Sequence, residues 1–302
     1  MKAECISSIR AVSHSFSGVV FAGAILLIAT CASAQNLFVS DLGNGDIIEI
    51  TPGGAQSTFA SGLTAWGLAF NSAGNLFAAN QAYENIIEIP PSGVQSTFAS
   101  GLDGPIGLAF NSVGNLFVSQ PYFGNNIIEI TPDGVQSTFA SGLDFPEGLA
   151  FNSAGDLFEA DLNTGHIYEF TPSGVQSTFA SGVWGAVALA FDSTGDLFVA
   201  NQTYNNITKI TPSGVQSIFA SGVYEPYALA FNSAGNLFVA ETDSDNIIEI
   251  TPDGTQSTFV SGLDEPIGLA FQPVPEPPTL GLMAVGATAL LVRFLKLGHL
   301  TT

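Results

Sequence analysis

Six oxygen-bearing side chains recur along this 302-residue chain at intervals of 39 to 41 residues. Each directly follows a short apolar segment that contains Leu-Phe, and together they are Asp41, Asn80, Gln120, Asp161, Asn201 and Glu241. Three carboxylates and three amides supply oxygen ligands that suit a hard cation such as Ca²⁺ or a hydroxyl-rich sugar. The same residue types also cap turns through Asx-type hydrogen bonds to the backbone, and this structural interpretation is the one that we favour.

A repeated unit of about 40 residues must position these side chains. Two phenylalanine series keep the same intervals, one with Phe38, Phe77, Phe117, Phe158, Phe198 and Phe238, the other with Phe70, Phe110, Phe151, Phe191, Phe231 and Phe271. One unit contains four short runs rich in β-branched and aromatic residues, at 107–111, 115–119, 126–131 and 136–141. Turn sequences such as NSVGN and TPDG join the runs. The pattern predicts an all-β fold, a six-bladed β-propeller with four antiparallel strands in each blade.

The two ends of the repeat array complement each other. The array starts at NLFVSD (36–41) without a preceding GLAF run, and it stops after GLAF (268–271) without the three runs that normally follow. Pairing these fragments completes one blade and leaves no unpaired sheet edge between the ends. We therefore predict a closed ring over 35–272, in which N-terminal strands pair with the last C-terminal strand. An open solenoid is the alternative, and it gives no reason for the complementary ends.

The repeat PIGLAFNSVGNLFVSQ (105–120) and its five relatives resemble the NHL family of propellers and, more distantly, the gluconolactonase/regucalcin family. The resemblance covers roughly 35–272 and implies that ligands bind on the axial face, at the end of the ring where the six oxygen-bearing residues open their loops. Gluconolactonase-like enzymes hold a divalent metal with carboxylate and amide residues placed just before the GLAF-like segments. The matching positions are Trp66, Ile106, Glu147, Val187, Tyr227 and Ile267. Glu147 is thus a weak candidate metal ligand, whereas Trp66 and Tyr227 suit stacking on a sugar or peptide.

Other catalytic chemistries lack the necessary residues. Cys5 and Cys31 both precede the repeats, which therefore contain no thiol. His166 is the only histidine of the repeats, and its counterparts are Asp or Asn before the third run, so we interpret it as a turn substitution. This weakens a lyase activity like that of the streptogramin-opening propellers. Paired carboxylates are left as candidates for an acid and a base.

The charge of the repeats limits the partners. Of 26 acidic residues only Glu4 and Glu276 fall outside 35–272, so this region has 24 acids against one base, Lys209, and a net charge of −23. Nucleic acid and anionic lipid need clustered Lys or Arg and are excluded. A charged column in the third run would spread around the rim, and we interpret it as solvated; it contains Glu49, Glu88, Glu129, Glu169, Lys209 and Glu249.

Both termini read as targeting segments. Residues 1–34 have the layout of a cleavable secretory signal, with processing expected between Ala34 and Gln35; a retained anchor and a lipoprotein with lipidated Cys31 are alternatives. Residues 273–302 resemble a PEP-CTERM sorting signal, with the box Pro275, Glu276 and Pro277, an apolar span at about 279–297, and the basic residues Arg293 and Lys296. The resemblance implies processing by a membrane-embedded sorting protease or transpeptidase of the exosortase type. A permanent C-terminal anchor is the alternative.

These observations together predict an exported propeller that reaches the cell envelope, surface or extracellular matrix and contacts the membrane only through its C-terminal segment. We expect a non-catalytic binding or scaffold module with a polysaccharide or protein ligand and without a cofactor. The alternative is a Ca²⁺-dependent, gluconolactonase-like hydrolase. A metal site that includes Glu147 would favour the enzyme, whereas retention of polysaccharide without metal would favour the binding module.

Overall fold

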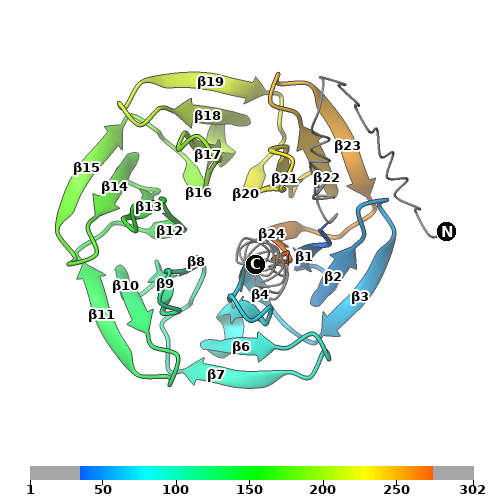
Figure 1. Ribbon diagram of the computed structural model, residues 1–302, viewed down its shortest axis with the longest axis horizontal. Coiled ribbons are helices and arrows are strands. Elements are labelled where there is room, and N and C mark those ends of the chain that lie inside the picture. The colour runs from blue at the N-terminus through cyan, green and yellow to red at the C-terminus, as the bar shows by residue number, and fades with distance from the viewer. Residues whose placement is uncertain (1–34, 275–302) are drawn as a thin grey trace, which may run out of the picture. The chain divides into compact units, whose positions relative to one another are not determined.

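A computed structural model describes residues 35–274, which form twenty-four β-strands and two short 3-10 turns. The strands build six four-stranded sheets around one axis, with one strand of each sheet nearest the axis and another on the rim (Figure 1). Every pairing between neighbouring strands within a blade is antiparallel. The all-β, six-bladed propeller predicted from the sequence is therefore confirmed.

We number the blades from the first complete repeat and give the strands of each blade from the axis outward. Blade 1 contains β4 (Ala65–Phe70), β5 (Leu76–Asn80), β6 (Asn85–Ile89) and β7 (Ser96–Ser100), and blade 2 contains β8 (Leu108–Phe110), β9 (Leu116–Gln120), β10 (Asn126–Ile130) and β11 (Gln136–Ser141). Blade 3 contains β12 (Pro146–Phe151), β13 (Leu157–Asp161), β14 (His166–Phe170) and β15 (Gln176–Ser181), and blade 4 contains β16 (Ala186–Phe191), β17 (Leu197–Asn201), β18 (Asn206–Ile210) and β19 (Gln216–Ser221). Blade 5 contains β20 (Pro226–Phe231), β21 (Leu237–Glu241), β22 (Asn246–Ile250) and β23 (Gln256–Ser261), and blade 6 contains β24 (Pro266–Phe271), β1 (Leu37–Asp41), β2 (Asp46–Ile50) and β3 (Gln56–Ser61). The 3-10 turns are η1 (Gln81–Tyr83) and η2 (Gln202–Tyr204).

Blade 6 closes the ring by joining the two ends of the repeat array. Its inner strand β24 pairs with β1 in antiparallel register, with Leu37 opposite Phe271. Two further hydrogen bonds extend this pairing, from the Gln272 amide to the Asn36 carbonyl at 3.0 Å and from Gln35 Nε2 to the Gln272 carbonyl at 2.8 Å. The predicted closure by N-terminal and C-terminal strands is confirmed.

The two phenylalanine series pack the blades against one another. Phe38 of β1 contacts Phe59 in its own blade and Phe70 in the next, with ring centroids 4.9 and 5.1 Å apart in edge-to-face geometry. The same three-ring arrangement repeats around the ring. Edge-to-face rings stabilise each other beyond the effect of their buried area. Each repeat therefore contributes one ring that holds two neighbouring blades together.

Glycine in the GLAF segment allows the inner strands to approach closely. A Cβ atom at Gly67 would collide with the Ile106 carbonyl oxygen of the next blade, and one at Gly107 would collide with that of Glu147. The turn glycines serve a different purpose, because Gly54 and Gly114 adopt φ values of +80° and +90° that glycine tolerates best. The turns predicted from TPDG-like and NSVGN-like sequences are thus present.

The charged column of the third strands requires a correction. Four of its glutamates, Glu49, Glu88, Glu129 and Glu249, accept a hydrogen bond of 2.6 to 2.7 Å from the asparagine that precedes the second strand of the same blade. In blade 4 the pair is instead a salt bridge of 2.6 Å between Lys209 and Asp196. These residues are partly buried and link a turn to its sheet, rather than being simply solvated.

The sequence-based assignments at 1–34 and 275–302 lie outside the residues that the structure describes. They include the signal peptide, the proline box and the apolar span at about 279–297. Within 35–274 there is no helix long and apolar enough to cross a membrane.

Candidate functional site

Two kinds of loop meet at one end of the ring. One kind joins the second and third strands of a blade, and the other leads from the outer strand of a blade to the inner strand of the next. Backbone hydrogen bonds tie them together, for example from Gly43 to Asp264 at 2.9 Å and from Gln202 to Gly185 at 2.8 Å. We call this end the loop face, and it contains the six oxygen-bearing residues at the ends of the second strands.

Four of these six residues hold the loop that enters their own blade. The side chains of Asn80, Asp161 and Glu241 accept hydrogen bonds of 2.7 to 2.9 Å from the backbone amides of Thr64, Asp144 and Tyr224, respectively. Asp41 accepts the corresponding bond from Asp264 at 2.6 Å. All four side chains are almost fully buried. Their oxygen atoms are directed at separate loops and do not converge on one cation.

Gln120 and Asn201 depart from this arrangement although they occupy the same position. The Gln120 side chain does not accept a loop amide within residues 35–274, where the Ile106 amide of blade 2 donates to the Ser119 carbonyl instead. Asn201 donates from Nδ2 to Asn206 Oδ1 and Thr208 Oγ1, both at 2.7 Å. Its own Oδ1 atom is buried and has no hydrogen-bond partner in the described chain.

The axial opening is lined by all six inner strands and encloses a cavity of about 100 Å³. Trp66 and Tyr227 lie at this opening, with ring centroids 5.7 Å apart in edge-to-face geometry. Glu147 occupies the equivalent position in blade 3 but is 2 % exposed. The remaining side chains of the lining are aliphatic or glycine, so the opening combines two aromatic rings with one carboxyl group.

Burial controls the protonation of the axial carboxyl. Removal from water raises the pKa of Glu147 from 4.5 to about 8, and its Oε2 atom has no hydrogen-bond partner among residues 35–274. Burial, and then the proximity of Glu147, also raise the pKa values of Tyr122 and Tyr227. Glu147 is therefore a neutral carboxylic acid at neutral pH.

Blade 3 contains another buried carboxyl, which the sequence analysis did not single out. Glu159 on β13 is fully buried, and neither carboxyl oxygen has a partner in the described part of the chain. Burial, followed by the charges of Asp161 and Glu147, raises its pKa well above 4.5. The other five blades have an apolar residue here, namely Val39, Ala78, Val118, Val199 and Val239. This break in an apolar column was the available sequence signal.

His166 is the first residue of β14 rather than part of the preceding turn. Its Nδ1 atom lies 3.0 Å from the Tyr168 hydroxyl, and its backbone pairs with that of Asp161. It is absent from the lining of the axial opening. Among residues 35–274 no group of three or more His, Cys, Asp or Glu side chains could hold a metal ion.

Exposed aromatic side chains gather on the loop face, and the sequence analysis missed them. Those that are exposed among residues 35–274 are Tyr83, Tyr122, Phe123, Trp184, Tyr204 and Tyr224, and all belong to the two kinds of loop described above. We call this set the aromatic face. The exposed large hydrophobic side chains of the turns at the opposite end are smaller and aliphatic: Val94, Val113, Val135, Val175 and Val215. The available sequence signal was the presence of aromatic residues in the loops of one end of the ring and their absence from the turns of the other end.

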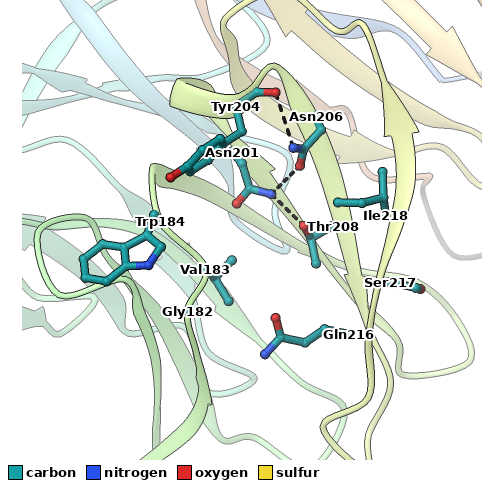
Figure 2. A pocket seen from close by; sticks show the side chains of 10 residues that line it. All are labelled: Gly182, Val183, Trp184, Asn201, Tyr204, Asn206, Thr208, Gln216, Ser217 and Ile218. Carbon is teal, nitrogen blue, oxygen red and sulfur yellow. Dashed lines mark hydrogen bonds between the residues drawn. The ribbon is translucent and has the colours of Figure 1, made fainter.

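A groove of about 530 Å³ opens on the loop face beside blade 4. Figure 2 shows Trp184 and Tyr204 on one side of it, with Thr208, Gln216 and Ile218 extending along the outer strands. Asn201 lies between Tyr204 and Thr208 in this view, with dashed hydrogen bonds to Thr208 and Asn206 (Figure 2). The groove therefore combines aromatic surfaces with amide and hydroxyl groups.

No protein-family model and no curated protein matches this chain. Among solved structures it is similar to virginiamycin B lyase from Staphylococcus aureus, at 19 % identity and a TM-score of 0.61, covering 80 % of this chain and 92 % of the lyase. A chain of a nidogen/laminin complex matches at 17 % identity and a TM-score of 0.73, covering 80 % and 100 %. A gluconolactonase from Xanthomonas campestris matches at 18 % identity and 0.62, covering 68 % and 79 %. Such low identities show the shared propeller fold, which serves both enzymes and binding proteins.

Proposed function

We propose that this protein is an exported, non-catalytic binding module that attaches to an extracellular polysaccharide or protein through its loop face. The observation that carries the proposal is the confinement of exposed aromatic side chains to that end of the ring. Aromatic residues provide large contact areas at little cost in conformational entropy, and an excess of exposed apolar side chains on one face is typical of an interaction surface. The axial opening with Trp66 and Tyr227 extends the same face toward the axis.

The charge of the ring narrows the class of ligand. A net charge of −23 over 35–272 repels polyanions such as nucleic acid and acidic polysaccharides. A neutral polysaccharide or an uncharged protein surface can approach without this penalty. Such a partner also agrees with a matrix or envelope location.

Retention on the polymer matrix of the producing cells tests the binding proposal. Replacing Tyr83, Phe123 and Tyr224 together with Ser should release the protein, because each change removes exposed aromatic surface from the loop face. The matched control replaces Val94, Val135 and Val175 with Ser, which removes the same number of exposed apolar side chains from the opposite end. Equal retention of the two triple variants would contradict the proposal.

Export and sorting form a separate part of the proposal, supported by the sequence at both termini. We propose that the chain is exported through the inner membrane, and that an exosortase-type enzyme recognises Pro275, Glu276 and Pro277 while the apolar span holds them at the membrane. Replacing these three residues with Ala should leave export intact and cause an unprocessed form to accumulate in the membrane fraction, as seen by immunoblotting. Release of this variant into the medium as efficiently as the unaltered protein would show that the box carries no sorting information.

One observation favours a second candidate, a hydrolase that acts at the axial opening. Glu147 is a carboxylic acid that stays protonated at neutral pH and lines the cavity, which is what general-acid catalysis needs. Ca²⁺ dependence would require further ligands, and Glu147 is the one carboxyl in the lining. Hydrolysis of a sugar lactone that is lost in Glu147→Gln, or calorimetric Ca²⁺ binding that is lost in the same variant, would favour this enzyme over the binding module.

A further inference from the structure

The groove beside blade 4 has the size and the openness to solvent of a ligand site. Its volume of about 530 Å³ falls in the range of small-molecule sites, several hundred to about a thousand Å³. Trp184 and Tyr204 are 51 % and 59 % exposed at its edge. It lies between the loop that enters blade 4 (182–185) and the strands β18 and β19.

Residue differences between the blades explain why the groove lies beside blade 4. Thr208 replaces the isoleucine found at Ile48, Ile87, Ile128 and Ile248, so a shorter side chain faces the preceding blade. Its cross-strand partner Ile218 replaces a threonine, so blade 4 exchanges the usual Ile–Thr pair for Thr–Ile. The exchange moves apolar bulk from a buried position on the third strand to an exposed position on the outer strand, where Ile218 is 61 % exposed.

The same differences create an unpaired acceptor in the groove. In blade 1, Asn80 Oδ1 accepts hydrogen bonds from the amide and hydroxyl of Thr64, at 2.9 and 3.0 Å. In blade 4 the corresponding loop residue is Trp184, which has no hydroxyl and whose amide does not donate to Asn201. The Asn201 amide group donates to Asn206, as that of Asn80 does to Asn85, and in addition to Thr208. Asn201 Oδ1 is then without a partner in the described chain, although Asn201 is 4 % exposed. A buried acceptor without a partner is costly unless a bound donor satisfies it.

We propose that this groove is a binding site for a neutral glycan chain, in which a sugar ring stacks on Trp184 and a sugar hydroxyl donates to Asn201 Oδ1. This proposal rests on the binding function proposed above and names the ligand class for one part of the loop face. The carbon-bound hydrogens of a pyranose form an apolar surface that packs on an aromatic ring. The amides of Asn206 and Gln216 supply both donors and acceptors for further hydroxyl groups.

The charges around the groove favour a neutral sugar over an acidic one. The single base of the ring, Lys209, is next to Thr208 on β18 and therefore points to the other face of the strand. It is also held by Asp196 at 2.6 Å and is absent from the groove lining. No cation of the described residues lines the groove to neutralise a uronate or a sulfate. The side chains of an apolar peptide would cover the amides of Asn206 and Gln216 without hydrogen-bonding to them.

The two tryptophans of the chain provide a direct test, because one lies at the groove and the other at the axial opening. In the full chain carrying Trp66→Phe, the emission of Trp184 should shift when one member of a panel of neutral hexasaccharides (cello-, malto-, laminari- and chitohexaose) is added at millimolar concentration. In the reciprocal Trp184→Phe variant, the emission of Trp66 should not change. A signal from Trp66 alone would place the sugar at the axis and overturn the groove assignment.

Two matched variants test the groove itself. Thr208→Ile introduces the residue of blades 1, 2, 5 and 6, fills the groove and removes the Thr208 hydroxyl that Asn201 bonds. Affinity for the hexasaccharide should therefore fall by about tenfold or more. Thr258→Ile makes the same chemical change on the exposed outer strand of blade 5 and should leave the affinity unchanged. Equal effects of the two variants would overturn the proposal.

The outcome also separates this site from the broader function. If no hexasaccharide changes the emission of Trp184, or if an apolar peptide does so in their place, the groove is not a glycan site. The matrix-retention experiment with Tyr83, Phe123 and Tyr224 uses residues outside the groove lining, and its result then decides the binding function independently.

Discussion

At the scale of single residues, blade 3 carries a group that opposes folding. Glu159 takes the place of four valines and an alanine, in a column that is otherwise buried and apolar. Leu149 lies opposite it on β12 and Tyr168 opposite it on β14. Neither carboxyl oxygen has a hydrogen-bond partner within 35–274, so burial costs free energy whether or not the group is charged.

Replacing Glu159 with Val should therefore stabilise the protein, by on the order of 1–3 kcal/mol, the cost of leaving a buried polar group unsatisfied. Urea denaturation at pH 7 measures the change. The reciprocal variant Val199→Glu places the same group in blade 4 and should destabilise by at least as much. A lower free energy of unfolding for Glu159→Val would show that Glu159 makes a favourable interaction in the ring.

The two buried carboxyls with raised pKa values, Glu147 and Glu159, also predict how stability depends on pH. Burial raises the pKa of Glu147 to about 8 and that of Glu159 well above 4.5, so the folded protein keeps protons that the unfolded chain releases. The stability gained from these retained protons is fully present below about pH 4.5, the pKa in the unfolded chain. It is lost as the pH rises through the higher pKa values of the folded protein. We expect urea midpoints to decrease from pH 5 toward pH 8, and to decrease less in Glu159→Val. An identical pH profile for the two proteins would contradict this assignment.

At the scale of elements, one side-chain contact links the residue before the second strand of a blade to its third strand. Blades 1, 2, 5 and 6 use Asn and Glu, whereas blade 4 uses Asp196 and Lys209 at 2.6 Å. Lys209 also lies 5.4 Å from the centroid of the Phe198 ring. Both forms pair an acceptor with a donor, whereas blade 3 has two carboxylates, Asp156 and Glu169, at these positions.

A double-mutant cycle should reveal coupling between the two positions. Lys209→Glu alone places two carboxylates together and should destabilise the protein by about 1 kcal/mol. Adding Asp196→Asn recreates the pair of the other blades and should recover most of that loss. The free energies of unfolding of the four proteins give the interaction energy. Strict additivity of the two substitutions would mean that the contact contributes nothing to stability.

The strands themselves were predictable because local sequence determines them. The run at 136–141 coincides with β11, and the runs at 115–119 and 126–131 agree with β9 and β10 to within one residue at each end. Identical turns and an alternating pattern repeat six times, so each strand is specified independently. The loops were less predictable, because the role of a residue such as Asn201 depends on Trp184 and Thr208, which lie at other points of the repeat. Comparison of aligned positions, rather than of motifs, identifies such departures.

At the scale of the whole molecule, the ring is closed by the pairing of strands from opposite ends of the array. The residues described contain no cysteine, so hydrogen bonds and packing are the means of closure. Leu37 faces Phe271 at the point where the other blades have a hairpin turn such as Asn111 to Asn115. In blade 6 the two ends of the repeat array therefore meet where the other blades have a turn.

Deleting residues 36–41 should destabilise all six blades together. The deletion removes β1 from between β24 and β2, and it exposes an edge on each of them. Phe38, which packs between Phe59 and Phe70, is lost as well, so the contact between blades 6 and 1 weakens. Thermal unfolding followed by circular dichroism should show a large drop in the Tm of the whole ring, rather than the early loss of a single blade.

A circular permutant provides the matched control for this deletion. Joining Phe271 to Asn36 through Asn-Ser-Ala-Gly gives blade 6 the turn of the other blades, and new termini at Gly182 open the loop between blades 3 and 4. This protein keeps every strand, and all four strands of each blade become continuous in the chain. Closure then rests only on packing between complete blades, so the permutant should fold into the same ring. If the permutant unfolds as readily as the deletion variant, strand pairing across the chain ends is what holds the ring together. If the deletion variant instead melts like the unaltered protein, packing between blades is sufficient and the pairing of β1 with β24 adds nothing to closure.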